Sequence, residues 1–479
     1  MVHKPGLYIL LFLIFLMTLI SAYSEKVYND FYNSGMIDAE YNYEFLEEEI
    51  KKYDLNTQEG LYWYVSDKND VDFYKLSKDY SYYSPEYYFI DNEIRPKIEC
   101  MNNNQYIDKN MGLYEECKTS YDLMIKKLNN YDWKSDINTL INEKNNELNE
   151  LNTMYTLGEL SEKEFKLEKA NISFDLDLLK YRLKYDIPFS YKNESAFLNE
   201  YSNNYYMYTS MNHDEKSYKT KEKLDEFKEI KASYFVNKYI VENNKIFDIT
   251  DTDSVASSLH YSFSFYGATF LVIALVVIFG GLISEEINKG TIKQLLIKPY
   301  TRSKILTSKI ISGIIMFLLF TVVYAFINIV IYGLFTGGIG SLFENSIIYN
   351  FSTNSVIEIN AFLEILLNFV CIIPMFIIVI LFVLLVSVIT SSNVGSIVSG
   401  FVLYFGSVLI LEMDYLSDKV VANAFLPIVN WDFSYYLFGG SHWFLHCNLT
   451  LSIIVTLVTI AILGVGTYLI FKYKDIKNQ

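Results

Sequence analysis

Five long apolar segments in the second half of the chain constrain its fold more than any other feature. They cover residues 265–283, 310–335, 361–390, 394–411 and 450–471. Each is long enough to cross the hydrocarbon core of a bilayer, which takes roughly 20 residues of α-helix. In lipid, a helix satisfies its own backbone hydrogen bonds, whereas irregular chain does not. The sequence therefore predicts an all-α polytopic membrane protein.

A sixth apolar segment, residues 7–22, lies near the N-terminus and follows Lys4. A signal peptide requires small residues before its cleavage site, and Ile20 is a poor match at the third position before a cut after Ala22. We therefore expect residues 1–23 to form an uncleaved first transmembrane helix. A cleaved signal peptide is the alternative.

Residues 24–260 have a different composition and contain no apolar run of membrane-spanning length. They hold 46 acidic and 29 basic residues, and so carry nearly all of the net charge of −16. Residues 135–185 show the pattern of two antiparallel helices joined by a turn at residues 157–161. Further helices are expected near residues 110–127 and 224–239. We predict a separate, mostly helical domain over residues 24–260, followed by a five-helix membrane domain over residues 261–479.

The many tyrosines of this acidic region are expected to serve packing, and a tyrosine-lined site for an aromatic or amphipathic peptide is the alternative. Cys100 and Cys117 form either a disulfide, if the region lies outside the cell, or two free thiols. His442 and His446 are four residues apart, but no third ligand is near in sequence, so no metal site is expected. The sequence pI of about 4.9 argues against nucleic acid as a partner.

The distribution of Lys and Arg predicts the orientation in the membrane. The segment Ser284–Lys309 holds six Lys or Arg against two acids, and the tail after residue 471 holds three lysines. Residues 336–360 hold no Lys or Arg. Short cytoplasmic loops are rich in positive charge. We therefore expect six spans, with both termini and the 284–309 loop in the cytoplasm and residues 24–260 outside.

The chain lacks the sequence motifs of an energy-converting enzyme. It has no GxxxxGK[ST] loop to hold nucleotide phosphates, and no HExxH or GxSxG motif. No charged residue stands at the centre of a predicted span, where an ion-coupled transporter usually needs one. We expect no enzyme activity and no cofactor in this chain, so transport would need energy from a partner protein.

The 284–309 loop has features of a docking element for such a partner. Ile292, Leu295 and Leu296 fall on one side of a short helix, and Pro299 cannot continue that helix. Gly290 permits close backbone approach. A short helix with an apolar face fits a groove on another protein. A loop that is merely positive would explain the lysines alone.

A second pattern of small residues occurs in the fifth segment. Gly395 and Ser399 are four residues apart, as are Ser396 and Gly400. Small residues at this spacing let helices approach closely in lipid. Packing within one chain and packing between two copies both fit this pattern.

The loop also resembles the first cytoplasmic loop of ABC-2 type transporter permeases. The resemblance rests on the order and spacing of twelve residues: Glu285, Glu286, Lys289, Gly290, Thr291, Gln294, Leu295, Leu296, Pro299, Thr301, Arg302 and Lys309. The six-span topology, with a large outer region after the first span, is also similar to that family.

The resemblance implies the permease subunit of an exporter in the cell membrane, driven by a separate ABC ATPase subunit and paired with a second copy or a related permease. The cargo would be hydrophobic, amphipathic or a peptide. A membrane-anchored sensor or immunity protein, whose outer domain binds a ligand without transport, is the alternative.

Overall fold

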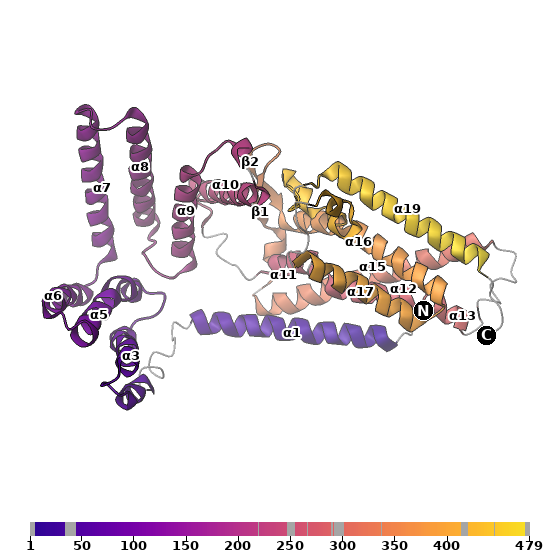
Figure 1. The fold of residues 1–479 in the computed structure, drawn as a ribbon, viewed down its shortest axis with the longest axis horizontal. Helices are drawn as coiled ribbons and strands as arrows, with labels where there is room; N and C mark the ends of the chain where they lie inside the picture. Colours follow the sequence, from indigo (N-terminus) through magenta and orange to yellow (C-terminus); the bar gives the residue numbers. More distant parts are fainter. Residues whose placement is uncertain are drawn as a thin grey trace. The chain divides into compact units, whose positions relative to one another are not determined.

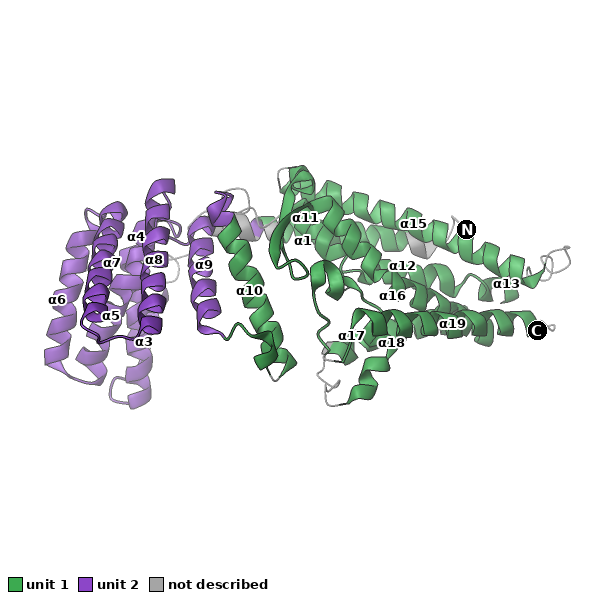
Figure 2. Ribbon diagram, turned by 90° about the horizontal axis from the view of Figure 1, so that it is seen from above, with its two compact units in different colours: residues 1–26, 212–239, 251–479 green, residues 27–211, 240–250 purple. Residues whose placement is uncertain are grey.

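The computed structural model describes the chain in ten segments that form two compact units, shown in separate colours in Figure 2. One unit contains residues 1–26, 212–239 and 251–479, and the other contains residues 27–211 and 240–250. The described residues are 5–33, 45–218, 220–246, 254–265, 267–288, 291, 301–336, 338–412, 420–444 and 446–474. We call the first unit the membrane unit and the second the helical unit.

The membrane unit contains five helical stretches long and apolar enough to cross a membrane, all within the part of the chain that the structure describes. The first stretch joins α12 (Thr269–Gly280) to α13 (Ser284–Asn288). The others are α15 (Arg302–Phe335), α16 (Ala361–Thr390), α17 (Asn393–Glu412) and α19 (Leu449–Tyr473), as Figure 1 shows. The five apolar segments predicted from sequence are thus confirmed as helices.

The first helix, α1 (Pro5–Asn33), is longer than predicted, but its apolar part, Tyr8–Ser24, is shorter than the five stretches above. Within the membrane unit, its Leu10 and Ile14 side chains are buried in the same core as the other helices. The Ser21 hydroxyl lies 3.0 Å from the Tyr332 hydroxyl of α15. α1 therefore packs with the membrane helices.

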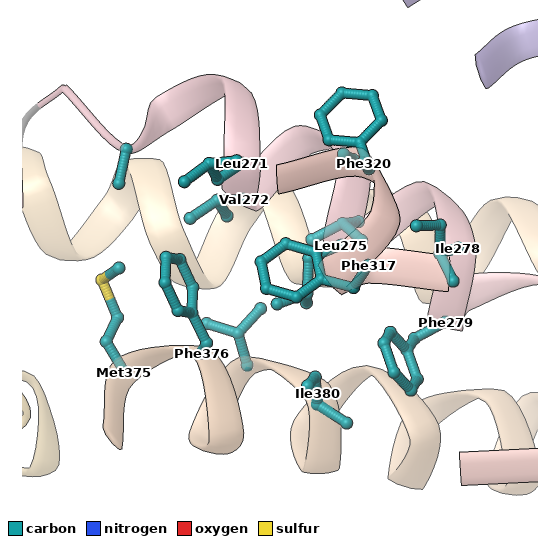
Figure 3. Packing of buried hydrophobic residues seen from close by; sticks show 14 of the residues in the cluster. Leu271, Val272, Leu275, Ile278, Phe279, Phe317, Phe320, Met375, Phe376 and Ile380 are labelled. Atoms are coloured by element: carbon teal, nitrogen blue, oxygen red, sulfur yellow. The ribbon is translucent and has the colours of Figure 1, made fainter. Parts of the chain in front are cut away.

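Helix α12 occupies the centre of the membrane unit and packs against α15, α16 and α17. It is apolar all round, as expected for a helix with no solvent-facing side. Figure 3 shows Leu275 and Phe279 of α12 beside Phe317 of α15 and Phe376 of α16. The rings of Phe317 and Phe376 are 5.3 Å apart between centroids. These side chains form the core that holds three helices together.

Three helices approach closely at Gly400 of α17. A Cβ atom at this position would lie 2.6 Å from a methyl of Val383 in α16 and 2.9 Å from Val276 in α12. Valine side chains have little rotamer freedom in helices, so they cannot easily make room. Only glycine fits here without moving a neighbouring helix.

The connection between α15 and α16 corrects the all-α prediction. It contains a two-stranded antiparallel hairpin of β1 (Asn345–Asn350) and β2 (Ser355–Asn360), in which Ile348 pairs with Ile357. The strands are rich in β-branched and aromatic residues, which favour extended chain. The strands were not predicted, because the absence of positive charge in this segment indicates its side of the membrane and not its secondary structure.

The helical unit is built from helices, two of them predicted as a hairpin at residues 135–185. These two are α7 (Trp133–Thr156) and α8 (Glu162–Tyr185), and Ser161 and Glu164 form a capping box at the start of α8. The other elements include η1 (Ile50–Lys52), α3 (Gln58–Ser77), α4 (Pro85–Phe89), η2 (Ile90–Ile94), α5 (Arg95–Asn102), η3 (Asn103–Ile107), α6 (Met111–Leu128) and α9 (Asn193–Ser210). A disulfide between Cys100 and Cys117 joins α5 to α6.

The membrane unit also includes most of α10 (Lys221–Glu242), which the sequence analysis assigned to the outer domain. The Lys231 amine donates to the Asn354 side chain at the hairpin turn, at 3.1 Å. The ring of Phe235 stacks on Tyr349 of β1, with centroids 5.6 Å apart. These contacts group α10 with the membrane helices. Helix α11 (Val255–Ser262) also belongs to the membrane unit and packs on α15 and α16.

Between α17 and α19 the chain folds into a compact loop with short helices, η7 (Val421–Phe425), α18 (Pro427–Asn430) and η8 (Ser434–Gly439). His442 is buried in this loop. Its Nδ1 accepts from the Phe444 amide at 3.0 Å, and its Nε2 lies 2.8 Å from the Val429 carbonyl. This pair of bonds requires the neutral ring with hydrogen on Nε2. Burial lowers the pKa of His442 to about 4.

We expect the substitution Gly400→Ala to lower the thermal stability of the detergent-purified protein. Overpacking against stiff side chains costs about 1–3 kcal/mol, which exceeds the helix propensity gained by alanine. The matched control is Gly406→Ala, six residues further along α17, where nothing lies within 4 Å of the added methyl. Melting temperatures that fall equally for both variants would contradict the close approach at Gly400.

We also expect the stability of the protein to fall as the pH drops from about 6.5 to about 4. The unfolded chain binds a proton on histidine near pH 6.5, whereas the folded chain resists protonation of His442 until about pH 4. The stabilisation is therefore complete above pH 6.5 and is lost on acidification, by on the order of 3 kcal/mol. The His442→Gln variant should show a smaller loss over this range when both proteins are melted at a series of pH values, and equal losses would exclude His442 as the cause.

Candidate functional site

The candidate site lies at one end of the membrane unit, where α13, the start of α15, the start of α17 and the ends of α16 and α19 meet. Thr301 caps α15, and its hydroxyl accepts from the Lys304 amide at 3.4 Å. Helix α15 therefore begins at Arg302. The last eight residues of the predicted loop 284–309 are helical, which corrects the sequence prediction that placed them in the loop.

The two acidic residues of α13 contact two different helices. Glu286 forms an ion pair with Lys309 of α15, with both side chains largely buried. An oxygen of Glu285 accepts from the Asn393 side chain at the start of α17, at 3.4 Å. Sequence reasoning selected Glu285, Glu286 and Lys309, and the structure brings them together as links between helices.

The break between α12 and α13 is held to α16 by two serine side chains. The Ser284 amide donates to the Ser387 hydroxyl at 3.2 Å. Both hydroxyls donate to the Gly280 carbonyl, Ser284 at 2.9 Å and Ser387 at 3.2 Å. Both serines are fully buried, so the three bonds fix the position of α13. Ser387 was not predicted as a site residue, because a serine inside an apolar helix has no pattern that identifies its partner.

Arg302 binds the end of α19. Its guanidinium donates to the carbonyls of Phe471, Lys472 and Lys474, at 3.2, 2.9 and 2.9 Å. The last carbonyls of a helix lack partners within the helix, and a cation also interacts favourably with the negative end of the helix dipole. Arg302 was predicted as a site residue, and its guanidinium is occupied within the chain.

Lys474 binds the end of α16 in the same way. Its amine donates to the Ile389 carbonyl at 3.1 Å, to the Ser391 hydroxyl at 2.6 Å and to the Val388 carbonyl. Burial lowers the pKa of this amine from its ordinary value. In the sequence, Lys474 indicated only the orientation of the last span. Its position directly after the last apolar segment could have indicated that Lys474 binds the carbonyls at a helix end.

Half of the predicted loop residues cannot be compared with the structure. Gly290, Ile292, Leu295, Leu296 and Pro299 lie outside the described residues. Thr291 is described, and its hydroxyl lies 3.5 Å from the Glu286 carbonyl.

The profile of one protein family matches residues 230–477, which is more than half of the chain. The family is described as Protein of unknown function (DUF2705). The chain belongs to this family. Searches of curated proteins and of solved structures find no match.

The DUF2705 match begins inside α10 and ends just after α19. It therefore covers the hairpin, the five apolar stretches and every residue of the candidate site. The matched region excludes residues 27–211 of the helical unit. The family match and the structural division both group residues 230–239 of α10 with the membrane helices.

Within the DUF2705 region, the small residues of α17 point to two different sides. Ser396 and Gly400 are buried, and Gly400 contacts α12 and α16. Gly395 and Ser399 instead line an open groove of about 650 Å³ together with apolar residues of α17, Phe382 of α16 and Ile428. One pair therefore serves packing within the chain, and the other pair faces outward.

The described residues contain no cluster of three His, Cys, Asp or Glu side chains that could hold a metal ion. Both ring nitrogens of His442 already have backbone partners within the compact loop.

We expect the ion pair between Glu286 and Lys309 to stabilise the protein. Glu286→Lys and Lys309→Glu should each lower the melting temperature, because each places two like charges together. The double variant should recover most of the loss, with a coupling free energy of about 1 kcal/mol for a partly buried pair. The control is the same exchange at Glu162 and Lys166, an exposed pair in α8, which should change little. Singles as stable as the parent protein would contradict the link.

Proposed function

We propose that this protein is the membrane-spanning subunit of an ATP-driven exporter of the ABC-2 type. It spans the cell membrane six times, with both termini in the cytoplasm and the helical unit outside. A separate ABC ATPase subunit binds and hydrolyses ATP, and a second permease copy or a related permease completes the transporter. The cargo is hydrophobic, amphipathic or a peptide, and it moves outward.

The observation that carries the proposal is the set of contacts around the 284–309 loop. Residues 284–309 include α13 and the start of α15, and the ion pair between Glu286 and Lys309 links these two helices. Arg302 extends the connection to α19, and Glu285 extends it to α17. A force applied to the loop therefore acts on four helices at once. Such a connection is what an ATPase needs in order to drive a permease by changing its own shape.

The sequence of the loop supplies the docking element. Ile292, Leu295 and Leu296 give a short apolar face ahead of Pro299, and Gly290 allows close backbone approach. The order of these residues resembles the corresponding loop of ABC-2 type permeases. The chain has no phosphate-binding loop of its own, so the ATPase is expected as a separate subunit.

Two features support an outside location for residues 336–360 and for the helical unit. Residues 336–360, which include the β-hairpin, contain no Lys or Arg. The Cys100–Cys117 disulfide of the helical unit is of a kind that persists in oxidising compartments.

The variants Leu295→Asp and Leu296→Asp test the coupling role. Each places a charge on the predicted apolar face, so we expect each variant to lose most co-purification with the ATPase subunit encoded nearest to this protein, and most stimulation of its ATP hydrolysis. The control is Leu157→Asp, at the exposed turn between α7 and α8, which should retain both.

Normal association and normal coupled hydrolysis in the two loop variants would show that the coupling assignment is wrong. A parent chain that binds no ATPase at all would favour the membrane-anchored sensor or immunity protein.

A further inference from the structure

We propose that one face of α15 binds an anionic phospholipid, with the phosphate of the head group beside Lys304 and Ser308 and an acyl chain along the apolar residues that follow. This site uses other residues than the predicted docking face of Ile292, Leu295 and Leu296. It rests on the membrane location of α15 and on no property of an ATPase.

The three basic side chains near the start of α15 differ in whether they have a partner within the chain. Arg302 is bonded to carbonyls of α19, and Lys309 is paired with Glu286. Lys304 is exposed, and its amine contacts no acid or hydrogen-bond acceptor among the described residues. Lys304 is therefore the base of these three whose charge is left for a ligand.

The second argument is a surface depression at the same place. It has a volume of about 450 Å³ and is lined by Ser303, Lys304, Thr307, Ser308 and Ile311. The Thr307 hydroxyl already donates to the Ser303 carbonyl at 2.9 Å. In the described part of the chain, the exposed Ser308 hydroxyl has no such acceptor. An ammonium group and a hydroxyl group at one depression suit the oxygens of a phosphate.

The third argument is the apolar stripe that continues from this depression. Positions three or four residues apart lie on one face of a helix, and the series from Lys304 onward stays on one face for six turns. After Ser308 the series becomes apolar, and every side chain in it is more than half exposed. Its members are Ile311, Ile315, Leu318, Val322 and Phe326.

The dimensions of this face match a phospholipid. Ser308 and Ile311 are separated by about 5 Å along the helix axis, so the polar group and the start of the stripe adjoin. The stripe from Ile311 to Phe326 is about 22 Å long, enough for one acyl chain. A soluble protein could contact the depression, but the stripe lies inside a stretch apolar enough to span the membrane. The lipid is therefore favoured over a protein partner.

The charge selects an anionic lipid. A lysine near the membrane surface contributes about 1 kcal/mol of attraction to anionic head groups. A zwitterionic head group carries its own cation and gains less from Lys304. We therefore expect phosphatidylglycerol to bind in preference to phosphatidylcholine with the same acyl chains.

Native mass spectrometry of the detergent-purified full chain tests the proposal, with phosphatidylglycerol and phosphatidylcholine added in competition. Lys304→Gln should lower the preference for phosphatidylglycerol about five-fold. Ser308→Ala should lower it by a smaller factor, and this variant keeps the test valid if Lys304→Gln is poorly folded. The control is Lys472→Gln, which removes a base at the end of α19 and should leave the preference unchanged.

Three results would overturn the proposal. The first is an unchanged preference in both Lys304→Gln and Ser308→Ala. The second is competition by inorganic phosphate as strong as that by phosphatidylglycerol, which would identify a site for a free anion. The third is loss of ATPase co-purification in Lys304→Gln with lipid preference intact, which would assign the lysine to a protein partner. Because the lipid assay contains no ATPase, its outcome is independent of the coupling test.

Discussion

The burial of α12 is the interaction on which the membrane unit depends. In lipid, apolar side chains gain little by leaving their surroundings, so the helices must be held by close packing and by polar contacts. α12 supplies the packing, because α15, α16 and α17 all contact it. Gly400 lets α17 approach within contact of both α12 and α16. Every other feature of the candidate site is arranged around the end of this central helix.

Polar contacts at the helix ends also hold the membrane helices together. Arg302 and Lys474 each satisfy the terminal carbonyls of a neighbouring helix, and each is itself the residue next to a helix end. These bonds link α15 to α19 and α19 to α16. Arg302 and Lys474 thus place positive charge at one end of the membrane unit and also hold neighbouring helices together there. The charge must be positive because its partners are the carbonyl oxygens at the negative ends of helices.

The helices could be predicted from the sequence because length and apolar composition determine them locally. The start of α15 at Arg302 could also have been read from the capping residue Thr301, but the positive charge of the segment suggested a loop. The partners of Ser387 and Lys474 could not be predicted, because they depend on which helices become neighbours. The β-hairpin escaped prediction because its strands are short and lie between two long helices.

The carbonyl of Gly280, at the break between α12 and α13, accepts hydrogen bonds from two different helices. A carbonyl oxygen has two lone pairs, and here each is used by a different hydroxyl, one from Ser284 and one from Ser387. If α13 turns, Ser284 moves with it while Ser387 remains on α16. The oxygen then keeps one donor throughout the rotation. The Gly280 carbonyl would therefore stay hydrogen-bonded, away from water, if the angle between α12 and α13 changed.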